Sequence, residues 1–258
     1  MLRQTLGRVA LFGVALGVPS AFAADMPLKA PPPPAFSWTG CYVGGNAGYA
    51  WGQTSGFNGT PTTVFFGTAV PETGPVYRGS SPNGGALGFQ DGCNYQVGQW
   101  VLGVEADFDG LLNEKGQGGP SPAIVNPINP NSVGKTTELF QSTYRARLGF
   151  TGWNNRVLVY VTGGGALMNV TSTQFITGHV AGSLNSQNDT PFGWTVGAGL
   201  EYAVTNQWLL RAEYLFVQIP TYTTFLGGAF LADPPVPLRI SLNQSIARVG
   251  LSYKWWGP

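Results

Sequence analysis

Two carboxylates, Glu105 and Asp107, stand two residues apart, and so do two arginines, Arg145 and Arg147. In a β-strand this spacing places both side chains of a pair on the same face. A pair of carboxylates with one face in common can carry out general acid–base catalysis. If the strands that carry the two pairs enclose one interior, the opposite charges neutralise each other instead. We therefore expect ion pairing from these residues rather than catalysis.

Other residues with chemical potential lack the partners that a reaction needs. His179 is the single histidine, and it falls in a long loop, where histidine is usually solvated. The triplet Gly163–Gly165 is followed neither by a helix nor by Gly-Lys-Ser/Thr, so it does not match a nucleotide-binding loop. The sequence therefore predicts no catalytic residue, no metal site and no cofactor.

Composition excludes several classes of protein. Charged residues make up 10% of the chain, aromatic residues make up 13%, and glycine accounts for 38 of 258 residues. A soluble domain has about 25% charged residues and about 7% glycine, so an ordinary helical or α/β enzyme is disfavoured. Disorder is disfavoured by the aromatic content. Thirteen basic residues against twelve acidic ones create no strong positive field, so no nucleic-acid partner is expected.

The elements that must position these side chains are β-strands. From Gly40 onward, apolar and polar residues alternate with period 2, as strands with two different faces require. The predicted strands are 10 to 14 residues long, which matches the roughly 9–11 residues of a tilted transmembrane strand. They lie near 41–52, 85–95, 99–111, 138–151, 157–170, 193–203, 208–218 and 244–255.

The connections between these strands alternate strictly between short and long. Outer-membrane barrels have this asymmetry, with short periplasmic turns and longer external loops. The short connections lie near 96–98, 152–156 and 204–207, and the long ones near 53–84, 112–137, 171–192 and 219–243. The pattern predicts an all-β fold, an eight-stranded antiparallel up-and-down transmembrane β-barrel with both termini in the periplasm.

Periodicity alone does not say which face points outward, and a soluble lipocalin-like barrel would turn its apolar face inward. A soluble exterior is about 25–35% charged, whereas the polar face here is mostly Gly, Ser and Thr. Its few charges are nearly balanced, which fits a narrow, ion-paired interior. The predicted interior charges are Glu105, Asp107, Arg145, Arg147, Glu201, Arg211, Glu213, Arg248 and Lys254. The facing of 157–170 stays open, because both of its phases are apolar.

Aromatic residues gather at both strand ends, as the interfacial girdles of membrane barrels do. The set predicted at the short-turn end is Trp38, Tyr42, Tyr95, Trp100, Tyr202, Trp208, Tyr253 and Trp255. The set predicted toward the long loops is Tyr49, Trp51, Tyr144, Trp194 and Phe216.

The two cysteines are expected to form a disulfide. In the first hairpin we place Tyr49 opposite Gly85, and the same register sets Cys41 opposite Cys93. Residues directly opposed in an antiparallel pair are within disulfide range, and an oxidising periplasm permits the bond.

The start of the chain is predicted to be a targeting segment rather than part of the fold. Residues 1–23 have a signal peptide's features: Arg3 and Arg8, then an apolar run over 9–18, then an Ala-Phe-Ala cleavage site. Residues 24–39 are predicted to be a proline-rich periplasmic lead-in, and 40–258 the barrel domain. The apolar run is about half the length that spans a bilayer, so it suits a cleaved signal peptide rather than a membrane anchor. We therefore expect the chain to be exported to the outer membrane.

Several segments resemble a known family. The mature start Ala24-Asp25-Met26-Pro27, the stretch 36–46 (FSWTGCYVGGN) and the strands at 100–108, 144–149, 193–202 and 248–255 occur in its order. The chain resembles the small "porin family" immunogenic surface barrels of rhizobia-like alphaproteobacteria. The resemblance implies delivery by periplasmic chaperones and the β-barrel assembly machinery, which favours a terminal aromatic residue. Here Trp255-Trp256 are followed by Gly257-Pro258.

Three functions are compatible with such a barrel. The first is a non-enzymatic outer-membrane protein, surrounded by lipid, that supports envelope integrity and presents surface loops. The alternative is a porin-like passive diffusion channel, although open porins have 16–18 strands. A lipid-modifying enzyme is the third, and it needs a nucleophile and a base within reach.

Overall fold

The computed structural model describes residues 36–58, 62–65, 68–71, 77–81, 83–112, 131–177, 183–226 and 236–257. The predicted signal peptide, most of the lead-in and His179 lie outside these residues. Among the residues that are described, no helix is long and apolar enough to cross a membrane.

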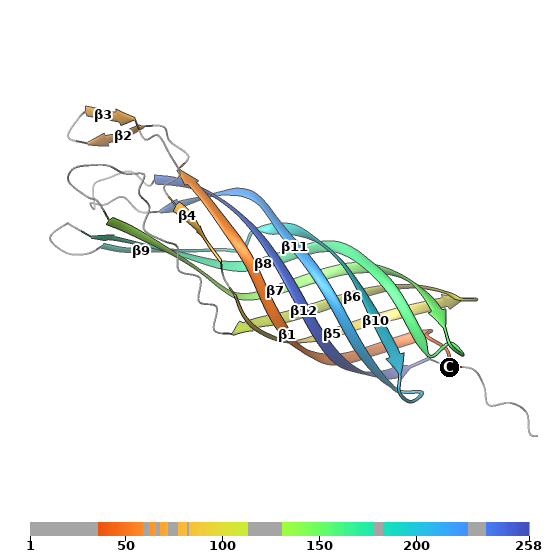
Figure 1. Cartoon of the computed structure of the whole chain (residues 1–258). Helices are drawn as coiled ribbons and strands as arrows, with labels where there is room; N and C mark the ends of the chain where they lie inside the picture. The colour runs from red at the N-terminus through yellow and green to blue at the C-terminus, as the bar shows by residue number, and fades with distance from the viewer. Residues whose placement is uncertain are drawn as a thin grey trace, which may run out of the picture. The chain divides into compact units, whose positions relative to one another are not determined.

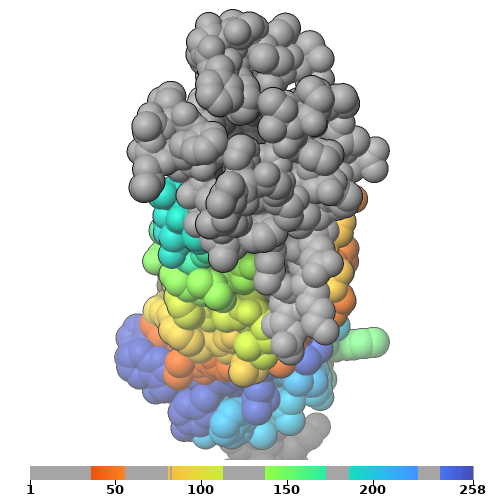
Figure 2. Space-filling model, turned by 90° about the vertical axis from the view of Figure 1, so that its left-hand side faces the viewer, coloured from red at the N-terminus to blue at the C-terminus, as the bar shows by residue number. Residues whose placement is uncertain are grey.

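Eight long strands pair with their neighbours in an antiparallel ring, β1-β5-β6-β7-β8-β10-β11-β12, which closes when β12 pairs with β1 (Figure 1). Orange β1 and blue β12 accordingly lie side by side in Figure 2. The predicted eight-stranded antiparallel barrel is confirmed. Its strands are β1 (Gly40–Asn58), β5 (Asn83–Val97), β6 (Trp100–Leu112), β7 (Asn131–Gly152), β8 (Val157–Thr177), β10 (Phe192–Ala203), β11 (Trp208–Leu226) and β12 (Val236–Trp256).

Shorter strands accompany the barrel toward the long connections. β9 (Ser183–Asp189) continues beside β8, and β4 (Tyr77–Ser80) pairs with β1. β2 (Thr62–Phe65) and β3 (Thr68–Pro71) form a separate hairpin. The strands β1, β7, β8, β11 and β12 run several residues further than the sequence predicts, because their backbones stay paired with the neighbouring strands into the segments predicted as long connections.

Burial alternates along most of the described length of the barrel strands, and the apolar phase points outward. In β7, for example, Arg145 and Arg147 are buried while Tyr144 and Leu148 are exposed. The strand whose facing stayed open, β8, turns Tyr160 and the alternate residues on either side of it inward. Most large apolar side chains therefore face away from the barrel, the reverse of a soluble fold.

Candidate functional site: an ion-pair network across the lumen

Cross-strand register brings opposite charges together inside the barrel. Three pairs stand directly opposite each other on neighbouring strands: Glu105 with Arg145, Glu201 with Arg211, and Glu213 with Arg248. Because alternate residues share a face, each of these side chains points into the lumen. The ionised side chains are 0–2% exposed.

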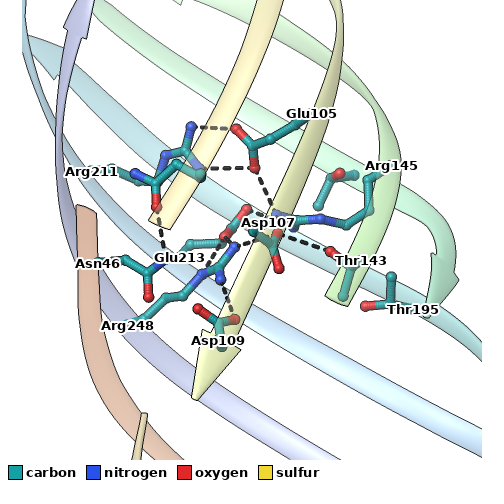
Figure 3. A network of polar contacts seen from close by, with 12 residues as sticks. Asn46, Glu105, Asp107, Asp109, Thr143, Arg145, Thr195, Arg211, Glu213 and Arg248 are labelled. Carbon is teal, nitrogen blue, oxygen red and sulfur yellow. Dashed lines mark hydrogen bonds and ion pairs between the residues drawn. The ribbon is translucent and has the colours of Figure 1, made fainter. Parts of the chain in front are cut away.

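Contacts also run between walls that are not neighbours. The Arg211 guanidinium of β11 reaches Glu105 on β6 at 2.5 Å. These two strands are four positions apart around the ring in either direction. Arg145 contacts Glu105 at 2.6 Å, Asp107 at 2.5 Å and Glu213 at 3.0 Å (Figure 3). The network therefore ties opposite sides of the barrel together.

Two more arginines complete the network. Arg248 binds Glu213 at 2.6 Å, Asp109 at 2.7 Å and Asp107 at 3.0 Å (Figure 3). Arg147 contacts Glu201 at 2.9 Å and Glu105 at 3.2 Å. The ten ion pairs join five carboxylates to four guanidiniums, so the network has one formal negative charge in excess.

Tyrosines extend the network, and the sequence analysis did not assign them to it. The Tyr42 hydroxyl donates to Glu105 and accepts from Arg147 at 2.7 Å. The Tyr160 hydroxyl donates to Glu213 at 3.0 Å, and its ring centroid lies 4.0 Å from the Arg147 guanidinium carbon. These contacts satisfy donors and acceptors that burial would otherwise leave costly.

Asp109 is a further member of the network that the sequence analysis omitted. A signal for it was present, because Asp109 continues the same alternate phase as Glu105 and Asp107. No comparable signal marks Tyr42, since an aromatic residue near a strand end is equally typical of a girdle.

Lys254 lies apart from this network. Its Nζ donates to the Ser37 carbonyl at 2.6 Å and lies 5.2 Å from the centroid of the Phe36 ring. Trp38 is 2% exposed, and its indole donates to the Asn155 carbonyl at 2.7 Å in the turn between β7 and β8. Residues 36–39 thus pack against the short-turn end, although the sequence analysis places them in the lead-in.

Apolar layers lie on both sides of the charges. Toward the short turns, Phe36 and Trp38 cluster with Leu158, Tyr160 and Leu209. Toward the long loops, the buried cluster includes Ala50, Met168, Leu215, Ile219, Leu242 and Ile246. The interior is therefore filled with side chains above, within and below the network.

The two cysteines are joined outside this interior. Cys41 and Cys93 stand opposite each other in the expected register and form a disulfide with a Cα–Cα distance of 4.0 Å. Cys93 is exposed and neither side chain is fully buried, so the bond lies on the outer face near the short-turn end.

Comparison with known proteins assigns this architecture. The family model "Outer membrane protein beta-barrel domain" matches residues 12–254. The chain belongs to the outer-membrane β-barrel family. A 31 kDa outer-membrane immunogenic protein of Brucella melitensis is 36% identical over 92% of this chain and 94% of its own. A 22 kDa outer membrane protein of Rhizobium leguminosarum is 31% identical over 73% and 67%.

Among solved structures, neisserial surface protein A matches with a TM-score of 0.40 and 14% identity, over 84% of this chain and 98% of its own. That likeness carries no weight in the assignment. The family and the named relatives confirm the outer-membrane location and the predicted kinship with small alphaproteobacterial surface barrels.

The exposed aromatic residues of this outer-membrane barrel lie largely where girdles were predicted. Tyr95, Trp100 and Trp208 are exposed near the short turns, and Tyr49 and Trp194 toward the long loops. The prediction is wrong for two residues: Trp38 and Tyr42 are buried inside the barrel. Tyr42 shares the inward phase of β1 with Gly44 and Asn46, and Trp38 precedes the strand, so neither faces lipid.

The arrangement links the walls of the barrel by ion pairs and presents no evident reactive centre among the described residues. Each carboxylate of the network contacts at least one guanidinium. Within the described ranges, no group of three or more His, Cys, Asp or Glu side chains could hold a metal ion. The chemistry that the geometry displays is mutual charge neutralisation in a space closed to water.

Proposed function

We propose that this outer-membrane barrel is a non-enzymatic membrane anchor that supports envelope integrity and presents its long loops at the cell surface. Outer-membrane lipid surrounds its apolar face, and periplasmic chaperones with the β-barrel assembly machinery deliver it. Trp255 and Trp256 at the end of β12 are the aromatic residues available for recognition by that machinery.

One observation carries the proposal against a diffusion channel. The contacts of Arg211 with Glu105 and of Arg145 with Glu213 cross the lumen at 2.5 and 3.0 Å. An eight-stranded barrel has an interior just wide enough for side chains. A solute path would have to break several of these ion pairs at once. Each broken pair leaves a buried charge without its opposite partner, which is energetically costly.

Planar-bilayer recording tests the absence of a channel. The folded chain is expected to insert without a steady conductance. A double variant, Glu105→Ala with Arg211→Ala, removes one charge of each sign and the contact between opposite walls. Provided that it still shows the boiling-dependent gel mobility of a folded barrel, it is expected to stay closed as well, because the buried clusters on both sides of the network still fill the interior. A steady, large conductance from the unaltered chain would contradict the proposal.

Two cellular measurements test the other parts. Deleting the protein is expected to increase sensitivity to detergents, and unchanged sensitivity would remove the envelope role. Protease added to intact cells is expected to cut within 113–130 or 227–235 and to leave the turn at 204–207 uncut. A lipid hydrolase activity that disappears in His179→Ala would overturn the non-enzymatic assignment.

A further inference from the structure

One carboxylate lies on the outward face of the barrel. Asp91 of β5 is exposed, and it shares its phase with Leu87, Phe89 and Cys93, which also point away from the lumen. In the described part of the chain, no side chain forms a hydrogen bond or an ion pair with it. Its carboxyl group therefore faces whatever surrounds the barrel.

The depth of Asp91 in the membrane follows from the two girdles. Along β5 it stands four residues from Tyr95, which is exposed near the short turns. It stands six residues from Gly85, which pairs with Tyr49 of the girdle toward the long loops. With a strand tilt of about 40°, four residues rise by roughly 10 Å. The apolar band of such a barrel is about 25 Å tall, so Asp91 lies near its middle.

Among the described side chains, Asp91 is the single charge at this depth of the outward face. Directly opposite it stand Val43 on β1 and Ala106 on β6. The other exposed charge on a described barrel strand, Arg239 of β12, pairs with Phe57, beyond the girdle toward the long loops. Ionisable residues within the membrane are costly and mark functional contacts.

A polar group reaches this depth on a second membrane-spanning surface. Lipid headgroups lie at the two interfaces, and the hydrocarbon between them offers neither donors nor acceptors. A different barrel with an outward cation at the same depth would carry the same penalty while alone. A second copy of this chain needs no such cation. A carboxyl group that holds its proton is both a donor and an acceptor, so two of them complement each other.

We propose that the outward face around Asp91 is the interface of a symmetric dimer of this barrel. Two copies inserted in the same direction are related by a twofold axis along the membrane normal, and this axis keeps each residue at one depth in both copies. Asp91 of one copy then meets Asp91 of the other. Around it the outward positions hold small residues, Ala106 on β6 and Gly45 and Ala47 on β1. Small residues let two backbones approach closely.

A row of stacked rings borders this interface on the side of the long loops. The ring centroids of Phe89 and Phe108 are 5.7 Å apart, and those of Phe108 and Phe140 are 5.2 Å apart, both at an interplanar angle of 27°. The three rings come from the neighbouring strands β5, β6 and β7. Because stacked rings hold one another in place, a second copy packs against them with little loss of side-chain freedom.

Energy transfer between copies tests the interface. Gln99→Cys and Gln207→Cys each place one free thiol in an exposed short turn, because the native cysteines are joined in their disulfide. The two turns lie on opposite sides of the ring, since β5 and β6 stand four positions from β10 and β11. Full-length chains labelled with donor or acceptor are mixed and folded into phosphatidylcholine vesicles at low protein density. Transfer is expected to be greater at 99 than at 207, and equal or absent transfer would overturn the dimer.

Substitutions at Asp91 separate the carboxyl contact from general apolar association. Asp91→Leu removes the donor and the acceptor, and it is expected to weaken association on the order of tenfold, seen as lower transfer at 99. Asp91→Asn keeps a donor and an acceptor in nearly the same shape and is expected to retain most of the transfer. Ala198→Leu alters the outward face of β10 and is expected to change nothing. Undiminished transfer in an Asp91→Leu chain with the gel mobility of a folded barrel would refute the contact.

Crosslinking in intact cells distinguishes a second copy from another partner. A photoreactive benzoylphenylalanine replaces Val104, which is 64% exposed and stands opposite Cys93. Illumination is expected to yield an adduct of two copies, which Asp91→Leu diminishes. An Asp91-dependent adduct with a different protein, together with no transfer in vesicles, would assign the face to that protein and overturn the dimer.

Discussion

Replacing Arg145 by methionine should destabilise the barrel far more than neutralising Asp109. Arg145 is wholly buried and binds three carboxylates at 2.5–3.0 Å. Methionine preserves most of the volume but leaves those carboxylates facing each other with one guanidinium fewer. Asp109 contacts one arginine, Arg248, at 2.7 Å. The network has five carboxylates for four guanidiniums, so Asp109→Asn brings the two formal charges into balance.

The magnitudes follow from these counts. Two unit charges 4 Å apart interact by about 4 kcal/mol at an effective dielectric constant of 20, and the desolvation of both partners offsets most of that gain. Removing one partner of a buried pair typically costs about 3–5 kcal/mol. We expect that loss for Arg145→Met, and a loss within about 1 kcal/mol for Asp109→Asn, whose amide still accepts from Arg248.

Urea unfolding in phosphatidylcholine vesicles measures both changes. The fraction folded is read from gel mobility without boiling, and the free energy of unfolding follows by linear extrapolation. The double variant Arg145→Met with Asp109→Asn should be more stable than the sum of its parts, because it carries less excess negative charge. Equal losses for the two single variants, or an Arg145→Met barrel as stable as the parent, would refute the charge-balance reasoning.

Three further substitutions test other parts of the barrel. Cys41→Ser should lower the free energy of unfolding by about 2–4 kcal/mol, because the disulfide closes a 52-residue separation; an unchanged urea midpoint would contradict this. Gly48→Ala should impair folding, because a Cβ there would lie 2.3 Å from the Ala247 carbonyl oxygen, whereas Gly45→Ala, with 3.7 Å of space, should fold normally. Trp38→Ala should cost about 3–5 kcal/mol, while Trp255→Ala, on an exposed side chain, should cost much less; equal losses would place residues 36–39 outside the fold.

The strands were predictable because the membrane imposes the same period-2 pattern on all of them. The register of the first hairpin followed from a single alignment, and it set Cys41 opposite Cys93. The facing of β8 did not follow, because residues such as Leu158 and Val159 are apolar in both phases. Its orientation is set by its neighbours, since Gly149 and Phe150 of β7 stand opposite Tyr160 and Val159.

Side chains that serve two physical roles were the least predictable. An aromatic residue at a strand end suits a membrane interface and an interior plug equally well, and only the closed ring shows that Tyr42 and Trp38 serve the interior. The bulge at Pro220 was likewise not predicted, because a proline beyond an apolar run is typical of a loop. In the structure that residue remains within β11, at the point where the register against β12 shifts between Ile219 and Tyr222.

The ion-pair network also explains how strands with few charged residues find one register. Slipping β7 by one residue would exchange its faces, placing Arg145 and Arg147 in lipid and Tyr144 and Leu148 in the lumen. An outward arginine costs about 2–4 kcal/mol at the bilayer midplane, and the five carboxylates left behind would share only the guanidiniums of Arg211 and Arg248. The penalty for the slipped barrel therefore exceeds what any single cross-strand contact contributes. The network can select the native register even if it makes the barrel no more stable than an apolar core would, because it destabilises the slipped registers.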